Sequence, residues 1–219
     1  MRMKFLSFLI FSIVSVSLYA QKIELPVDTM VVTNHSVNIN GKNINYTAQT
    51  GTQPVWNEAG KPVASLFYTY YKRSDIKNTE NRPLVISFNG GPGSASVWMH
   101  IAYTGPRVLK IDDEGFPVQP YGLKENQFSI LDVADIVYVN PVNTGYSRLI
   151  EKGDDKVDRK DFFGVQADIK YLAGWLNTFV TRKNRWLSPK YLIGESYGTT
   201  RVSGLALELQ NSQWMYLNG

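Results

Sequence analysis

The stretch LIGESYGTTR, residues 192–201, decides the fold. It contains the pattern Gly-x-Ser-x-Gly with Ser196 at its centre. A short apolar run introduced by a proline precedes the pattern and is typical of a buried strand. The segment from Thr199 to about Met215 follows it and carries apolar side chains at the spacing of a helix. These side chains belong to Val202, Leu205, Leu209 and Trp214.

A strand, this pattern and a helix together form the setting of a nucleophile elbow. Gly194 and Gly198 leave room for the backbone to reverse sharply, so that the Ser196 hydroxyl projects from the edge of the sheet. The N-terminus of the following helix adds partial positive charge where an oxyanion would form. The pentapeptide by itself also fits an ordinary turn, so its setting is what favours a catalytic serine.

Residues 1–20 are predicted to be a signal peptide. Arg2 and Lys4 make a basic start, Phe5 to Tyr19 form a 15-residue, mainly apolar run, and Ala20 offers a small residue for cleavage. The run is too short for a membrane span. The mature chain is expected to begin near Gln21. Since the chain has no cysteine, a lipid anchor through cysteine is excluded. We therefore expect a secreted or periplasmic protein without a stable membrane anchor.

The charge of the chain gives no reason to expect a nucleic-acid partner. Leaving out Arg2 and Lys4 lowers the net charge from +4 to +2, and the other basic residues are scattered. The basic cluster at 182–185 is predicted to be a solvated helix end. With no cysteine and two isolated histidines, His35 and His100, we expect no disulfide, no metal site and no other cofactor.

The first part of the chain is predicted to be antiparallel. Within residues 27–72, positions 37–46 alternate apolar and polar side chains around Gly41, and positions 64–71 are rich in aromatic residues. Both patterns are typical of strands, so antiparallel strands are expected at the start of the fold.

The rest of the chain alternates strands with helices. Apolar runs at 83–88 and 134–139 predict buried strands, and helical spacing predicts an amphipathic helix over 164–181. The charged segment 151–161 is predicted to be a surface loop. Residues 21–219 are therefore predicted to form an α/β domain with a mixed, mostly parallel sheet.

A second informative stretch is FNGGPGSASVW, residues 88–98. A phosphate-binding loop would need a lysine after its glycines, and here Gly93 is followed by Ser-Ala-Ser. Gly90 and Gly91 can instead present unhindered amides to a developing negative charge. An α/β-hydrolase builds its oxyanion hole from such an early loop and the amide after the nucleophile. Considered alone, the loop also fits a plain tight turn.

Together these motifs resemble the serine carboxypeptidases, a family with the α/β-hydrolase fold. The resemblance rests on NGGPG at 89–93, NPVNTGYS at 140–147 and GESYG at 194–198, and it covers most of residues 46–219. It implies an exported enzyme that releases C-terminal residues from peptides through an acyl-enzyme. The expected partner is a peptide or small acyl substrate, and no oligomeric state is predicted.

The resemblance also implies roles for individual residues. Ser196 would be the nucleophile, and the amides of Gly91 and Tyr197 would form the oxyanion hole. Asn89 and Glu195 would hold the C-terminal carboxylate of the substrate. Glu195 would have to share a proton with that carboxylate, because two adjacent negative charges repel each other, so binding is expected to be best in mildly acidic conditions.

Four positions depart from the family pattern. Ser94 stands where the family often has a disulfide cysteine, and Tyr103 stands where it often has a second carboxylate-binding glutamate. Val139 and Asn143 replace the usual acid and glycine of the third motif. Because the carboxylate site is incomplete by this pattern, an esterase or acyltransferase of the same fold is an open alternative.

The triad of an α/β-hydrolase runs serine, acid, histidine. Only 23 residues follow Ser196, and they include one acid, Glu208, and no histidine. Glu208 is predicted to face solvent from the helix, and His35 and His100 are predicted to be structural or surface residues. The sequence therefore predicts an N-terminal part of a longer enzyme, or a gene product truncated after the elbow helix, neither stably folded nor active alone. A non-catalytic exported binding protein or inert fragment is the remaining alternative.

Overall fold

A computed structural model describes residues 25–151 and 156–219. The predicted signal peptide and the mature start at Gln21 lie outside the described residues. Among the helices that are described, none has both the length and the apolar character needed to cross a membrane.

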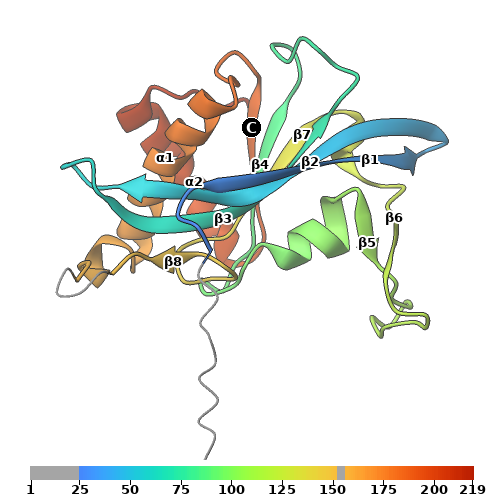
Figure 1. The fold of residues 1–219 in the computed structure, drawn as a ribbon, viewed down its shortest axis with the longest axis horizontal. Helices are drawn as coiled ribbons and strands as arrows, with labels where there is room; N and C mark the ends of the chain where they lie inside the picture. Colours follow the sequence, from blue (N-terminus) through green and yellow to red (C-terminus); the bar gives the residue numbers. More distant parts are fainter. Residues whose placement is uncertain (1–24, 152–155) are drawn as a thin grey trace, which may run out of the picture.

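Within the described residues, a seven-stranded sheet has the order β1-β2-β3-β7-β4-β9, with β8 beside β3 (Figure 1). Its strands are β1 (Thr29–Ile39), β2 (Lys42–Trp56), β3 (Pro62–Arg73), β4 (Leu84–Phe88), β7 (Asp135–Val139), β8 (Arg148–Leu149) and β9 (Lys190–Gly194). A second, two-stranded sheet pairs β5 (Arg107–Leu109) with β6 (Leu123–Glu125).

The sheet is mixed, as predicted, but its parallel part is smaller than a mostly parallel sheet implies. In the described residues β4 pairs in parallel with β7 and with β9, whereas β1, β2, β3, β7 and β8 are joined by antiparallel pairings. The reason is local connection: β1, β2 and β3 follow one another through short turns, and such turns can join only antiparallel strands.

Both faces of the central strands are buried, because successive side chains point to opposite sides of a sheet. On β4, Leu84, Ile86 and Phe88 join the larger core cluster, whereas Val85 joins a cluster on the other face. Helices α1 (Val165–Arg182) and α2 (Tyr197–Gln213) contribute to the larger cluster and lie together on one side of the sheet in Figure 1. The π-helical segment η1 (Met99–Thr104) packs on the other face.

Most predicted elements lie where the patterns placed them, and the end of α2 is an exception. The helical spacing placed Trp214 among the buried side chains, but Trp214 is 75% exposed and Met215 is buried. The cause is the helix end: Trp214 adopts a left-handed conformation with φ of 52°, and the Met215 amide donates to the Leu209 carbonyl at 3.0 Å.

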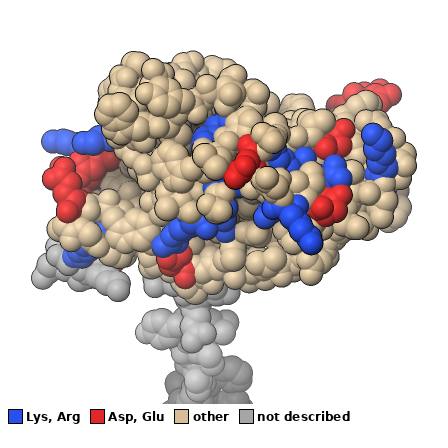
Figure 2. Space-filling model, turned by 90° about the horizontal axis from the view of Figure 1, so that it is seen from above, with Lys and Arg blue, Asp and Glu red and all other residues tan. Residues whose placement is uncertain are grey.

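The basic cluster at 182–185 was predicted to be solvated, which is correct for Arg182 and wrong for Arg185. Arg182 is exposed and pairs with Asp28 at 2.9 Å. The next turn contains Asn184 at φ of 54° and carries Arg185 into the protein, where it is 1% exposed. Elsewhere the prediction of scattered charge fits the surface, since Figure 2 shows basic side chains lying among acidic ones on that face.

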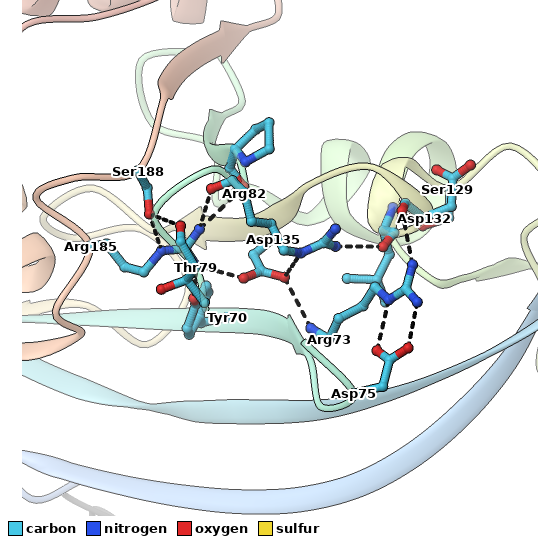
Figure 3. Close-up of polar contacts among 12 residues, drawn as sticks. Tyr70, Arg73, Asp75, Thr79, Arg82, Ser129, Asp132, Asp135, Arg185 and Ser188 are labelled. Atoms are coloured by element: carbon cyan, nitrogen blue, oxygen red, sulfur yellow. Dashed lines mark hydrogen bonds and ion pairs between the residues drawn. The ribbon is translucent and has the colours of Figure 1, made fainter. Parts of the chain in front are cut away.

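Arg185 belongs to a buried network at the edge of the sheet where the parallel strands begin (Figure 3). Its Nη1 donates to Asp135 Oδ2 and to the Tyr70 hydroxyl, each at 2.5 Å. Arg82 Nε donates to Asp135 Oδ1 at 2.8 Å. Burial raises the pKa of Tyr70 well above its usual range, so Tyr70 keeps its proton. One fully buried carboxylate thus joins two arginines that lie far apart in the sequence.

Candidate active site

Ser196 stands at the sharp turn between β9 and α2, where the sequence predicts the elbow. Its φ of 55° and ψ of −125° are unusual for a residue with a side chain and hold the backbone in a strained conformation. The turn is closed by a hydrogen bond from the Gly198 amide to the Glu195 carbonyl at 2.8 Å. Ser196 itself is exposed.

Gly194, the glycine before the serine of the elbow, is required because the backbone of α2 passes very close to it. A Cβ on Gly194 would collide with the carbonyl group of Gly198. The Gly-x-Ser-x-Gly pattern therefore follows from the geometry of this turn, which brings the start of α2 back against the end of β9.

The glycine loop at 89–93 lies against the elbow, because β4 and β9 are parallel neighbours and their ends meet at one edge of the sheet. The contact is close: a Cβ on Gly90 would lie 2.6 Å from the backbone nitrogen of Tyr197. Gly91 has φ of 109°, a conformation that favours glycine. The predicted oxyanion-hole amides, those of Gly91 and Tyr197, thus lie on two segments that touch.

Asn89 and Glu195, predicted to share a substrate carboxylate, are brought into contact across these two segments. Asn89 Nδ2 donates to Glu195 Oε2 at 3.2 Å, and Asn89 Oδ1 accepts from the Met99 amide at 3.0 Å. Asn89 is buried, whereas Glu195 is exposed. A fixed amide therefore orients a carboxylate that an incoming ligand can reach.

The four residues that depart from the family pattern lie in two kinds of position: on exposed segments or turns, and in the core. Ser94 is exposed on the glycine loop, and Tyr103 is 59% exposed in the last turn of η1. Asn143 has φ of 59°, a conformation that glycine favours and asparagine tolerates, so its backbone suits the turn that the family's glycine would make. Val139 is fully buried in the larger core cluster.

The side chains of the two histidines make their contacts with residues other than those of the elbow. His35 is on β1, at the edge of the sheet opposite β9, and is exposed. His100 Nε2 is hydrogen-bonded to the Tyr71 hydroxyl at 2.6 Å, and its ring stacks on Tyr138. Burial lowers the pKa of His100 to about 4, so its imidazole is neutral at pH 7. In the part of the chain that is described, neither histidine is hydrogen-bonded to Ser196.

Glu208, the acid after the elbow, is partly buried on α2 instead of fully facing solvent. Its Oε1 accepts a hydrogen bond from the Ser212 hydroxyl, one turn later, at 2.7 Å. This local contact within the helix gives it no link to the nucleophile.

Sequence reasoning missed a buried ion pair behind the site. Arg201 Nε donates to Asp168 Oδ2 at 2.8 Å, and Arg201 Nη1 donates to the Asn89 carbonyl at 2.8 Å. A signal was present in the sequence. Arg201 precedes the buried Leu205 by four residues, which places its charge on the apolar face of the helix.

The third motif, residues 140–147, and the residue before it contact Ser96, which follows the glycine loop. The Ser96 amide donates to Asn140 Oδ1 at 3.0 Å, and the Ser96 hydroxyl donates to the Val139 carbonyl at 2.5 Å. The Ser147 hydroxyl donates to the Asn140 carbonyl at 2.6 Å. Residues 140–147 therefore help to hold the glycine loop in place, although they contain neither the predicted nucleophile nor the predicted oxyanion-hole amides.

Comparison with known proteins gives a consistent result. The family model for serine carboxypeptidases matches residues 41–216. Serine carboxypeptidase-like 19 of Arabidopsis thaliana is 32% identical over 66% of this chain and 29% of its own length. The human retinoid-inducible serine carboxypeptidase is 30% identical over 77% of this chain and 34% of its own.

Among solved structures, the prohormone-processing carboxypeptidase Kex1 of Saccharomyces cerevisiae is similar with a TM-score of 0.60 and 22% identity. The match covers 78% of this chain and 35% of that one. This likeness shows the α/β-hydrolase fold. The chain spans about a third of the length of the proteins it matches.

Proposed function

The chain belongs to the serine carboxypeptidase family, and on this premise we propose that it carries the nucleophile of an exported enzyme that removes C-terminal residues from peptides. The observation that carries the proposal is the contact between Asn89 and Glu195 beside Ser196. A serine nucleophile accounts for hydrolysis in general, whereas a carboxylate-binding pair next to it accounts for the choice of a chain end.

In this proposal the Ser196 hydroxyl attacks the carbonyl carbon of the last peptide bond. The general base takes the hydroxyl proton and gives it to the leaving amine as the C–N bond breaks, which leaves an acyl-enzyme. Water then attacks the acyl carbon, the shortened peptide leaves as a carboxylic acid, and the serine oxygen regains its proton. The amides of Gly91 and Tyr197 stabilise the oxyanion of each tetrahedral intermediate. A serine hydroxyl needs a general base to be reactive. The proposal therefore requires a base that neither His35 nor His100 supplies in the described geometry.

The free C-terminus of the substrate would bind between Asn89 and Glu195. Glu195 and the substrate carboxylate can be neighbours only if they share a proton, so peptide binding should weaken as the pH rises and that proton is lost. Glu195→Gln keeps a hydrogen-bonding group without the charge. It should flatten the pH dependence of KM on the alkaline side, while Glu208→Gln on the adjacent helix should not.

The nucleophile is tested by labelling the full-length gene product with a fluorophosphonate and mapping the labelled peptide. The label is expected on Ser196 and should be lost in Ser196→Ala but kept in Ser203→Ala, which changes an exposed serine on α2, the helix that follows Ser196. Ser196→Ala should also lower kcat by several orders of magnitude. A label on another residue of active protein would refute the assignment.

An esterase or acyltransferase is the second candidate, favoured by Tyr103, where the family often has a second acid. The two candidates differ in their need for a free carboxylate. The comparison uses one peptide with a free C-terminus and the same peptide with a blocked one, between pH 5 and 8. Equal rates of cleavage of both peptides, with no effect of Glu195→Gln on the ratio of the two rates, would favour the esterase.

Export is proposed from the sequence of residues 1–20. Material recovered outside the cytoplasm should begin near Gln21 when its N-terminus is sequenced. Native protein that begins at Met1 would contradict this part of the proposal.

A further inference from the structure

We propose that Arg201, held in place by Asp168, is a positioning residue that fixes the glycine loop against the elbow. In doing so it sets the spacing between the amides of Gly91 and Tyr197. The inference rests on the proposed function, because that function assigns the two amides to one oxyanion hole.

Arg201 reaches the glycine loop at two points. Its Nη1 donates to the Asn89 carbonyl at 2.8 Å, and its Nη2 approaches the Pro92 carbonyl at 3.5 Å. These carbonyls flank the peptide that carries the Gly91 amide. Arg201 belongs to α2, the helix that begins with Tyr197. One side chain therefore links the element that supplies one amide to the loop that supplies the other.

Asp168 fixes the guanidinium from the opposite side. Asp168 Oδ2 accepts from Arg201 Nε at 2.8 Å, and Asp168 Oδ1 accepts from the Tyr171 hydroxyl at 3.0 Å. The same Tyr171 hydroxyl accepts from the Val142 amide at 3.1 Å. These hydrogen bonds connect the Arg201–Asp168 pair to α1 and to the third motif. A shift of the arginine would therefore disturb its contacts with α1, the third motif and the glycine loop.

The burial of this pair indicates a geometric role. Arg201 is 1% exposed, and Asp168 is also buried. Replacing such a pair by apolar side chains of similar volume is often neutral or stabilising, so its contribution to stability does not explain it. A planar guanidinium that binds a carboxylate and two carbonyls does define a position and an orientation.

Oxyanion stabilisation depends on that position. Donor groups must lie about 2.7–3.1 Å from the oxyanion, and loss of one donor lowers kcat by about 10²–10³-fold. The interaction forms in the transition state, so a displaced glycine loop should lower kcat and leave KM nearly unchanged.

The chain contains a matched control for Arg201. The Arg82–Asp135 pair has the same separation of 2.8 Å and is similarly buried, although Asp135 also binds Arg185 and keeps that cation in Arg82→Met. It lies at the opposite end of β4, near the start of that strand. The experiment compares Arg201→Met with Arg82→Met in the full-length gene product. Three quantities are measured: the melting temperature, kcat and KM for a C-terminal peptide substrate, and amide hydrogen exchange in residues 88–98.

Arg201→Met is expected to lower kcat by about 10²-fold, close to the loss of one oxyanion donor, with little change in KM. It should also speed hydrogen exchange in residues 88–98. Both variants should lower the melting temperature, because each takes a cation away from a buried carboxylate. Arg82→Met, however, should leave kcat and this exchange near the wild-type values. Arg201→Met with wild-type kcat and unchanged exchange would overturn the inference.

Two further measurements distinguish a failure of this inference from a failure of the proposed function and from misfolding of the variant. If the wild-type protein does not hydrolyse peptides, the proposed function fails, and the exchange measurement still decides whether Arg201 positions the loop. If Arg201→Met does not fold, Asp168→Asn is measured in its place. This variant keeps the shape of the side chain but removes its charge, and a kcat and exchange equal to wild type would overturn the inference.

Discussion

Gly90→Ala would place a methyl carbon inside the contact between the glycine loop and the elbow. That carbon would lie 2.6 Å from the Tyr197 backbone nitrogen and 2.8 Å from both the Glu195 carbonyl oxygen and Ser196 Cβ. These atoms belong to the backbone or directly adjoin it, so no side-chain rotation can remove the overlap. The two segments must separate.

The size of the effect follows from that separation. An ordinary contact begins at 3.4 Å, so the nitrogen and the methyl carbon must move 0.8 Å farther apart. Overpacking of this kind costs about 1–3 kcal/mol of the free energy of unfolding. In the proposed enzyme, a displacement of about 1 Å between catalytic groups lowers kcat by about 10²-fold.

Gly93→Ala in the same loop is the control. A Cβ there meets no heavy atom within 4 Å, and Gly93 is not among the glycines with positive φ. Its free energy of unfolding should therefore stay within about 0.5 kcal/mol of wild type. Urea unfolding and kcat are measured for both variants in the full-length gene product. Equal values for Gly90→Ala and Gly93→Ala would refute the close approach of the two segments.

Two further predictions concern buried titratable groups. Asp135→Asn removes the charge between two buried arginines and should cost about 3–5 kcal/mol in urea unfolding, whereas Asp113→Asn on an exposed turn should cost less than about 0.5 kcal/mol. His100 has a pKa lowered from 6.5 to about 4, so below pH 6.5 the unfolded chain binds a proton that the folded chain does not. Stability should thus fall as the pH drops from 6.5 to 4, by up to about 3 kcal/mol. His100→Gln should reduce this fall, and identical pH profiles would contradict the assignment.

The fold was largely predictable because its patterns are local. The strand character on both sides of Gly41, the strands that became β4, β7 and β9, and the helix over 164–181 each follow from the spacing of neighbouring side chains. The parallel share of the sheet was not predictable in this way. It depends on which strands become neighbours, and periodicity within one segment carries no information about its partner.

In the candidate site, too, the features formed by consecutive residues were predictable, and those formed by residues far apart in the sequence were not. The elbow at Ser196 was visible because strand, turn and helix are consecutive in the sequence. The contact between Asn89 and Glu195 was implied only by the family resemblance, since it arises from the pairing of β4 with β9. Arg185 was missed for a related reason. A basic residue after a helix is usually solvated, and its buried partners come from β3 and β7.

Strand β4 is held by a buried arginine–aspartate pair near each end, and the two pairs should act independently. Arg82–Asp135 lies where the strand begins, and Arg201 binds the Asn89 carbonyl where it ends. The first and last of the five residues of β4 are four steps of about 3.3 Å apart, which is about 13 Å. This exceeds the distance of about 10 Å beyond which the effects of substitutions usually add. The double variant Arg82→Met/Arg201→Met should therefore lose the sum of the two single losses of unfolding free energy, within about 0.5 kcal/mol, and have the kcat of Arg201→Met alone. A double variant with a much lower kcat than Arg201→Met would mean that β4 transmits strain from one end to the other, and that the first pair also positions the glycine loop.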